Sequence, residues 1–330
     1  MSAYPVNTCY LGIDIGGTKC AVVLGILTNT TAIVVAKRRF PTPNTPTATL
    51  AQCMIAGEEL VRTCDGQRLV ALGISCGGPL DSRRGLILSP PNLPGWDTVD
   101  VVTPLRERFG VPVILQNDAN AGALAEWQWG AGRGCQTLIF LTFGTGLGAG
   151  LILDGHLYSG NSNLAGEVGH LRLTAEGPVG YGKAGSFEGW CSGGGISQLA
   201  RSIANEYLTR GTPTSYCPTD ATLDQVTAEA VGRAAQEGDP VAHEIWSMVG
   251  QRLGQGIAVL IDLLNPERII LGSIYLRQQA LLEPAMRAAL RLEALPGALE
   301  HCQILAAGLG EQIGDYASLA VAAQASAAVR

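Results

Sequence analysis

The hydrophobic and polar positions of the chain follow two different periods. Short apolar runs rich in β-branched residues predict strands, and longer stretches with apolar residues three or four positions apart predict helices. The predicted strands are Tyr10–Ile15, Cys20–Leu27, Thr31–Arg39, Leu69–Ser75, Val113–Gln116, Thr137–Phe143, Ala149–Asp154 and Arg268–Leu271. The predicted helices are Ala48–Arg62, Asn117–Gly130, Ile196–Arg210, His243–Leu264 and Tyr316–Val329. Strands and helices mixed in this way predict an α/β fold.

Two glycine-rich turns occupy comparable places in this pattern. Residues 11–19 (LGIDIGGTK) and 139–147 (IFLTFGTGL) both read as a strand, a turn of small residues that carries a threonine, and a returning strand. This self-similarity predicts a duplicated α/β fold with a ligand bound between the two halves.

Composition and charge narrow the class of ligand. The 330 residues are 47% hydrophobic and 15% charged, which argues against disorder. The net charge of −6 argues against nucleic acid or an anionic membrane as a partner, but backbone N–H groups can still bind a small phosphate ligand. We find no apolar run of about 18 residues and no signal peptide. The nine cysteines are scattered without a Cys-x-x-Cys pair, which indicates reduced thiols and a cytoplasmic location.

The first glycine-rich turn has the composition of a phosphate-binding loop. Gly16 and Gly17 let a phosphate approach the backbone, Thr18 and Lys19 supply donors, and Asp14 is placed to hold Mg²⁺ through water. The same residues are also common in an ordinary β-hairpin turn, so both interpretations stay open at this point.

The second turn, Gly144-Thr145-Gly146, is a second candidate phosphate loop. With Ala149 it also satisfies the G-x-G-x-x-G/A pattern of dinucleotide-binding proteins, and Glu167 follows about 20 residues later. That pattern should open a helix, whereas the residues after it read as a short strand, so the dinucleotide alternative is weak.

Four further positions carry side chains suited to catalysis or to sugar recognition. Asp118 directly follows a predicted buried strand, where it is placed to accept a proton from a substrate hydroxyl; the alternative is a helix N-cap. Glu167, His170 and Glu188 are suited to binding several hydroxyls. Taken singly, His170 also fits a structural histidine and Glu188 a solvated loop charge.

The order of these segments carries more information than any one of them. DIGGTK, QNDANAGALAE, FGTGLGAG, GNSNLAGEVGH, SFEGWCSGGGI and LNPERIILG, in this order, resemble the ROK family over about residues 10–320. ROK proteins are sugar kinases and sugar-responsive repressors. The resemblance implies the RNase H-like fold of actin and hexokinase, with two lobes and an active-site cleft between them. The expected small lobe is 1–118 plus about 312–330, and the expected large lobe is 119–311.

The resemblance also assigns roles to individual residues. Asp118 is implied to be the catalytic base. The implied ATP and phosphate contacts are Asp14, Gly16, Gly17, Thr18, Lys19, Gly144, Thr145, Gly146 and Gly272. The implied sugar contacts are Gly78, Asn92, Asn117, Glu167, His170 and Glu188.

One segment departs from the family pattern. ROK proteins usually hold Zn²⁺ with three cysteines and the histidine that corresponds to His170. Here Val179, Tyr181 and Ser186 stand where the cysteines would be. Valine cannot bind zinc, and tyrosine and serine are poor ligands for it. We therefore expect no zinc site, and suggest that packing of Val179 and Tyr181, with a hydrogen bond to His170, holds this loop instead.

These inferences converge on an ATP- and Mg²⁺-dependent hexose kinase that most readily phosphorylates the 6-hydroxyl of glucose. N-acetylmannosamine, N-acetylglucosamine, fructose and allose are alternative acceptors, and a sugar-binding regulatory protein without catalysis is an alternative of another class. We expect a cytoplasmic homodimer or homotetramer with no DNA-binding domain.

Overall fold

The computed structural model describes residues 7–64 and 66–327, and the chain divides into two compact units. Unit 1 is Met1–Phe140, Gly150–Gly166 and Ala307–Arg330, and unit 2 is Leu141–Ala149 and Glu167–Ala306. The units differ from the predicted lobes in where the segment after residue 118 belongs: it is part of unit 1, whereas the prediction gave it to the large lobe. The lobe boundaries stay a prediction.

Unit 1 contains a mixed five-stranded sheet in the order β3-β2-β1-β4-β8. Its strands are β1 (Thr8–Ile15), β2 (Lys19–Leu27), β3 (Ala32–Pro41), β4 (Arg68–Cys76) and β8 (Val113–Asn117). The first three form an antiparallel meander, and β4 and β8 run parallel to β1. The loops that follow β1, β4 and β8 therefore emerge at one edge of the sheet, where open α/β sheets bind ligands.

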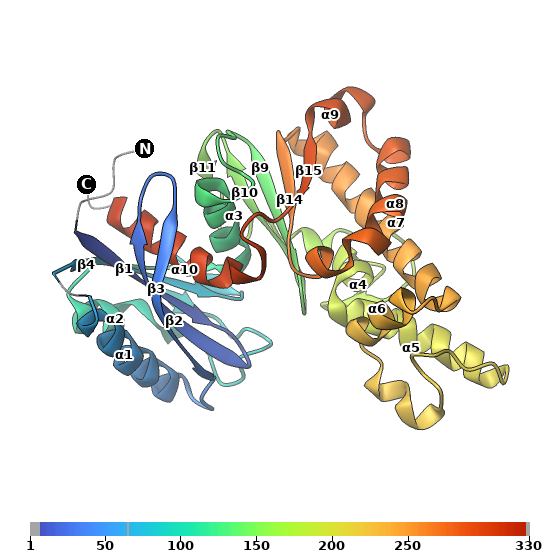
Figure 1. The fold of residues 1–330 in the computed structure, drawn as a ribbon, viewed down its shortest axis with the longest axis horizontal. Helices are drawn as coiled ribbons and strands as arrows, with labels where there is room; N and C mark the ends of the chain where they lie inside the picture. Colours follow the sequence, from blue (N-terminus) through green and yellow to red (C-terminus); the bar gives the residue numbers. More distant parts are fainter. Residues whose placement is uncertain (1–6, 65, 328–330) are drawn as a thin grey trace. The chain divides into compact units, whose positions relative to one another are not determined.

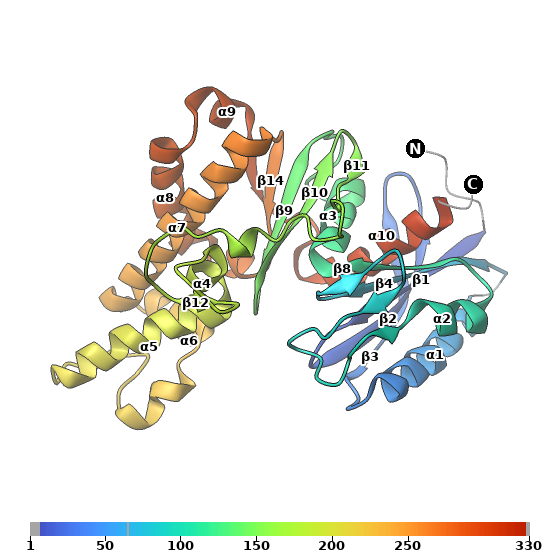
Figure 2. The same ribbon diagram turned by 180° about the vertical axis from the view of Figure 1, so that it is seen from behind.

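Helices cover both faces of this sheet (Figures 1 and 2). On one face lie α1 (Pro46–Arg62) and α2 (Val102–Phe109), and on the other lies α10 (Ile313–Ala327), which also packs against α3 (Asp118–Trp129). On the α10 face β1 and β4 present Gly12 and Gly73, whose missing side chains leave room for the helix.

The second five-stranded sheet has the order β11-β10-β9-β14-β15, which repeats the order of the first sheet strand for strand. Its strands are β9 (Leu138–Phe143), β10 (Leu147–Leu153), β11 (His156–Leu157), β14 (Arg268–Leu271) and β15 (Gln303–Ala306). The predicted duplicated α/β fold of the actin and hexokinase type is confirmed by this repetition.

The helices of unit 2 outnumber those of unit 1. They are α4 (Phe187–Cys191), α5 (Gly193–Thr209), α6 (Ala228–Gln236), α7 (Pro240–Leu264), α8 (Ile274–Glu293) and α9 (Pro296–His301). The longest, α7, packs along α8, with Gly250 and Gly254 close to the α8 backbone. Short strands complete the chain: β5 (Leu80–Asp81), β6 (Leu86–Ile87) and β7 (Val99–Asp100) form one small sheet, and β12 (Val179–Gly180) pairs with β13 (Lys183–Ala184).

Every strand and helix named from the sequence is present within a few residues of its predicted bounds. Residues 328 and 329 of the predicted last helix lie outside the described residues. The prediction missed the helices α2, α4, α6, α8 and α9. In α8 the helical pattern is broken by a kink at Gln278 and by Pro284, although Leu282 and Met286 keep the four-residue spacing of a buried face.

Two other expectations concern membranes and thiols. Among residues 7–64 and 66–327, no helix is long and apolar enough to cross a membrane. All nine cysteines are free thiols, which agrees with the predicted reduced state, and all except Cys64 are buried.

Candidate functional site

The turn between β1 and β2 is held from outside by Thr42. The Gly16 N–H donates to the carbonyl oxygen of Lys19 at 3.2 Å, which closes the turn. The Thr42 hydroxyl donates to the Gly16 carbonyl at 2.5 Å, and the Thr42 N–H donates to the Thr18 carbonyl at 3.0 Å. Gly17, Thr18 and Lys19 are exposed. The turn is therefore fixed in shape while its outer surface stays open to a ligand.

At this turn the predicted phosphate contact Gly17 meets the predicted sugar contact Asn92. A Cβ atom on Gly17 would overlap the carbonyl oxygen of Asn92, so the backbones of the two residues are in direct contact. Asn92 lies in a loop ordered by a hydrogen bond from the Ser89 N–H to the Trp96 carbonyl (2.8 Å) and by the burial of the Trp96 side chain. Within unit 1 the structure thus brings a predicted phosphate contact and a predicted sugar contact together.

At the start of α3 the helix N-cap is Asn117 and not Asp118. The Asn117 side chain is the N-cap: its Oδ1 accepts from the N–H groups of Ala119 (2.9 Å) and Asn120 (3.4 Å). Asp118 also accepts from Ala119 with Oδ1 (2.8 Å), but no hydrogen bond to Oδ2 is found among the described residues. Because Asn117 supplies the cap, the Asp118 carboxylate keeps an oxygen available for other chemistry.

The electrostatics of Asp118 favour proton acceptance. The side chain is reached by solvent, yet the protein atoms around the carboxyl remove enough water to raise its pKa, and the N–H bond from Ala119 opposes that rise. A carboxylate with a raised pKa is a stronger base than an ordinary aspartate.

Asp14, at the end of β1, lies in a group of carboxylates. Burial, the charge of Asp118 and, more weakly, that of Asp315 raise the pKa of Asp14 to about 7, and Lys37 opposes them. Lys37 donates to Asp315 Oδ2 at 2.6 Å. Asp315 lies on α10, far along the chain, and the sequence analysis missed it because no local pattern connects it with Asp14.

These carboxylates fit a hard divalent cation. Mg²⁺ prefers oxygen ligands, keeps several waters and is commonly bound by one or two carboxylates together with substrate phosphates. Among the described residues no group of three acidic, histidine or cysteine side chains could enclose a metal by itself. That finding is compatible with Mg²⁺ held at Asp14 through water, because such a site needs phosphate oxygens to complete it.

In unit 2 the second glycine-rich turn joins β9 and β10. Thr145 and Gly146 are exposed, and a Cβ atom on Gly144 would meet no protein atom within 4 Å. The turn leads into the strand β10 and not into a helix, so the dinucleotide-binding alternative is wrong. A turn with two exposed residues and open space in front of Gly144 retains the features expected of a phosphate loop.

Glu188 is bound to this turn and is not a solvated loop charge. Its Oε2 accepts from the Leu147 N–H at 2.9 Å, and a Cβ atom on Gly146 would come within 2.9 Å of the same oxygen. Gly272, a predicted ATP contact, follows β14 and donates its N–H to the Leu141 carbonyl at 2.9 Å.

His170 lies in the loop where the family zinc site would be. Its ring meets the Tyr181 ring edge-on at 5.0 Å between centroids, and its carbonyl accepts from Lys183 Nζ at 2.7 Å. Val179 is 42% exposed, so the suggestion that it fills the space of a metal is wrong. Ser186 caps α4, and among the described residues neither Ser186 nor Tyr181 is hydrogen-bonded to the His170 ring, so the suggested hydrogen bond is wrong, while the ring contact between Tyr181 and His170 exists. The absence of zinc stays a prediction.

The predicted site residues fall into two sets. Unit 1 carries Asp14, Gly16, Gly17, Thr18, Lys19, Gly78, Asn92, Asn117 and Asp118. Unit 2 carries Gly144, Thr145, Gly146, Glu167, His170, Glu188 and Gly272. Within unit 1, Gly17 meets Asn92, and a Cβ atom on Gly78 would lie 3.3 Å from Asn117 Nδ2.

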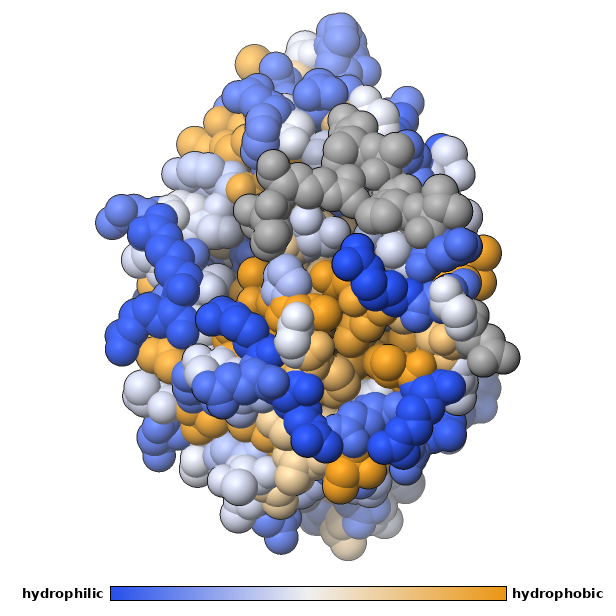
Figure 3. Space-filling view, turned by 90° about the vertical axis from the view of Figure 1, so that its left-hand side faces the viewer, coloured by the Kyte–Doolittle hydropathy of each residue, from blue (hydrophilic) through white to orange (hydrophobic). Residues whose placement is uncertain are grey.

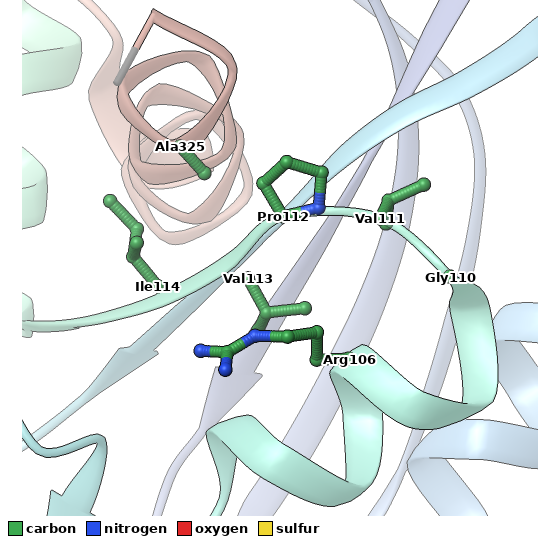
Figure 4. A pocket seen from close by; sticks show the side chains of 7 residues that line it. All are labelled: Arg106, Gly110, Val111, Pro112, Val113, Ile114 and Ala325. Atoms are coloured by element: carbon green, nitrogen blue, oxygen red, sulfur yellow. The ribbon is translucent and has the colours of Figure 1, made fainter. Parts of the chain in front are cut away.

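A pocket of about 580 Å³ in unit 1 lies away from these loops (Figure 4). It is lined by the end of α2, the start of β8 and Ala325 of α10, and Figure 3 shows apolar surface at this end of unit 1. The candidate loops follow the carboxyl ends of β1, β4 and β8, whereas the pocket is at the amino end of β8. It holds no carboxylate or histidine and is not the candidate site.

Comparison with known proteins agrees with this geometry. The ROK family model matches residues 10–325. The chain is 32% identical to a glucokinase of Streptomyces coelicolor over 263 residues, covering 79% of this chain and 80% of the relative. It is 30% identical to the Escherichia coli transcriptional repressor Mlc over 243 residues, covering 72% of this chain and 57% of that protein.

A solved structure extends the likeness to three dimensions. The ROK glucokinase of Streptomyces griseus, crystallised with glucose and AMPPNP, matches with a TM-score of 0.77 and 30% identity over 96% of this chain and 99% of that one. The family model matches nearly the whole chain. The chain belongs to the ROK family.

Proposed function

We propose that this protein transfers the γ-phosphoryl group of ATP to a hexose, with the 6-hydroxyl of glucose as the first candidate acceptor. The observation that carries the proposal is the state of Asp118. It directly follows the carboxyl end of β8, the edge strand beside β4, its capping role is taken by Asn117, and its pKa is raised. Similarity to glucokinases supports the choice of sugar.

The residues of unit 1 supply the acid–base chemistry of this proposal. Asp118 accepts the proton of the acceptor hydroxyl through the oxygen that is not bonded to Ala119, as the hydroxyl oxygen attacks phosphorus. Asn92 and Asn117 orient the sugar, with the Asn117 amide nitrogen available because its oxygen caps α3. The rigid turn at Gly16–Thr18 presents N–H groups to the phosphates.

The residues of unit 2 supply the second phosphate loop and the remaining sugar contacts. The exposed N–H groups of Thr145 and Gly146 bind phosphate oxygens, and preorganised N–H donors stabilise the charge that develops during transfer. Glu167 and His170 bind sugar hydroxyls. When bound at Asp14, Mg²⁺ neutralises charge on the phosphate oxygens.

A second candidate function is regulatory sugar binding without catalysis, and the similarity to the repressor Mlc favours it. The two functions differ in turnover. A regulator would bind glucose and release no ADP above the background, whereas a kinase would release ADP in proportion to sugar phosphate formed.

The test is a coupled ADP-release assay with ATP, Mg²⁺ and a panel of hexoses, run on the wild type and on Asp118→Asn. We expect turnover of the variant to fall about 100-fold or more, with glucose affinity little changed, because asparagine keeps the shape but accepts no proton. Asp154→Asn, at an exposed turn, is the matched control and should keep full activity. Near-normal turnover of Asp118→Asn would refute Asp118 as the base.

The same preparation allows two further expectations to be measured. Sedimentation would show whether the protein is a homodimer or homotetramer, as the family resemblance implies. The sugar panel would decide between glucose and the alternatives N-acetylmannosamine, N-acetylglucosamine, fructose and allose. Cytoplasmic location stays a prediction.

A further inference from the structure

The side chain of Glu188 is attached to the second phosphate loop before any ligand is bound. One carboxylate oxygen, Oε2, accepts the Leu147 N–H at 2.9 Å. Leu147 is the first residue of β10 and its side chain is buried, so this bond fixes the point where the loop re-enters the sheet. Charged acceptors make backbone hydrogen bonds about twice as strong as neutral ones.

The other end of this loop, at Gly144, is fixed by Gly193, which follows Glu188 closely in the chain. The Gly193 N–H donates to the Gly144 carbonyl at 2.7 Å, and Gly193 is the first residue of α5. The segment 187–193 therefore holds the loop at both ends and leaves Thr145 and Gly146 exposed between them.

The segment 187–193 is itself rigid. Phe187 is fully buried and its ring fills the space beside Gly256 of α7. Ser186 and Ser192 cap the two helices that the segment joins. A Cβ atom on Gly189 would overlap the carbonyl oxygen of Pro178. The backbone of Glu188 cannot shift without disturbing these contacts, so its carboxylate is a firm anchor for Leu147.

Two glycines let the backbone approach the Glu188 side chain closely. A Cβ atom on Gly146 would lie 2.9 Å from Glu188 Oε2, and one on Gly169 would lie 3.2 Å from Glu188 Cβ. The second oxygen, Oε1, makes no hydrogen bond among the described residues and is left for a sugar hydroxyl.

We propose that Glu188 is a positioning residue for the second phosphate loop, and that by bonding Leu147 with one oxygen and the acceptor sugar with the other it couples acceptor binding to nucleotide binding. This inference rests on the proposed function for its ligands. A sugar hydroxyl on Oε1 restricts rotation of the carboxylate and thereby holds Leu147 in place. Sugar therefore raises nucleotide affinity, and by linkage nucleotide raises sugar affinity by the same factor.

The first arm of the test measures binding of Mg-ADP by calorimetry without sugar. Glu188→Ala removes the acceptor of Leu147 and should weaken Mg-ADP binding about tenfold or more, while Glu188→Gln keeps an acceptor oxygen and should stay within about threefold of the wild type. Glu244→Ala is the control and should bind Mg-ADP as the wild type does, because Glu244 is an exposed glutamate on α7 in the same unit and is not one of the candidate site residues. A Glu188→Ala protein that binds Mg-ADP as the wild type does would overturn the proposal.

The second arm measures the coupling itself. Saturating glucose should tighten Mg-ADP binding to the wild type by about fivefold or more, in the usual range of coupling between sites, and should have no such effect on Glu188→Ala. Equal Mg-ADP affinity of the wild type with and without glucose would overturn the proposed coupling.

A third arm needs no ligand and separates this inference from the proposed function. Amide hydrogen exchange at Leu147 should speed up in Glu188→Ala and not in Glu188→Gln, with unchanged exchange in α7 as evidence of an intact fold. Unchanged exchange at Leu147 would overturn the positioning role. If the wild type binds neither Mg-ADP nor glucose, the proposed function fails, and this arm still decides whether Glu188 holds the loop.

Discussion

Asp14, the proposed Mg²⁺ contact, is predicted to reduce the stability of the folded protein. It lies between the negative charges of Asp118 and Asp315, with solvent access limited by burial, and its pKa rises from 3.8 to about 7 on folding. Asparagine has the shape of a protonated aspartate. Asp14→Asn therefore removes the unfavourable charge and keeps the packing, so the variant should be more stable than the wild type at alkaline pH.

The size of the effect follows from the two pKa values. The folded pKa is above the unfolded one, so the folded state holds the proton more tightly. The stabilisation that the protonated Asp14 carboxyl gives the folded state is complete below about pH 3.8 and is lost as the pH rises to about 7. At about 1.4 kcal/mol per pKa unit, the ionised carboxylate costs about 1.6 kcal/mol at pH 5 and about 4 kcal/mol at pH 8. Residual solvent around Asp14 screens the charges, so the cost at pH 8 should exceed the cost at pH 5 by about 1–3 kcal/mol.

The assay is urea unfolding of the wild type and Asp14→Asn at pH 5 and pH 8, with EDTA present so that no cation binds the carboxylate. A chain of two units need not unfold in one step, so unfolding of unit 1 is read from hydrogen exchange in β1 and α10. Asp14→Asn should gain about 1–3 kcal/mol over the wild type between pH 5 and pH 8. Parallel pH dependence of the two proteins would refute the reasoning.

Three other measurements probe the site and the fold. Gly144→Val meets no protein atom at its Cβ, so it should leave stability within about 0.5 kcal/mol of the wild type and weaken Mg-ADP about tenfold in calorimetry; unchanged affinity would remove Gly144 from the nucleotide site. Glu126→Ala leaves the N–H groups of Ala131, Gly308 and Leu309 without their carboxylate acceptor and should cost about 3 kcal/mol or more in urea unfolding, with a smaller loss for Glu126→Gln. Elemental analysis should find well under one zinc per chain, and EDTA treatment followed by Mg²⁺ should restore full activity, whereas stoichiometric zinc would contradict the expected absence of the metal.

The sequence was informative wherever one short segment determines the structure. The β1–β2 hairpin was predictable because its apolar runs flank a glycine turn, and α7 because its apolar residues recur every four positions. The cap of α3 was also predictable, since Asn and Asp are common at that position.

Contacts between distant segments were not predictable in this way. The bond from Lys37 to Asp315 and the bonds from Glu126 to Gly308 and Leu309 join residues that only the folded chain brings together. The family resemblance pointed to Glu188 as a sugar contact, but its bond to Leu147 depends on how 187–193 packs under the turn. Side-chain pairing of this kind leaves no periodic signal in a single sequence.

The position of α10 along the chain has a consequence for biosynthesis. The helix fills the space left by Gly12 and Gly73 on the first sheet, where Ser318 and Ala322 pack closest, but it follows the whole of unit 2 in the sequence. During translation the strands of unit 1 leave the ribosome long before the helix that covers them. The nascent chain therefore carries one uncovered apolar sheet face while unit 2 is being made, and chaperone binding at that face is the expected protection against aggregation until α10 arrives.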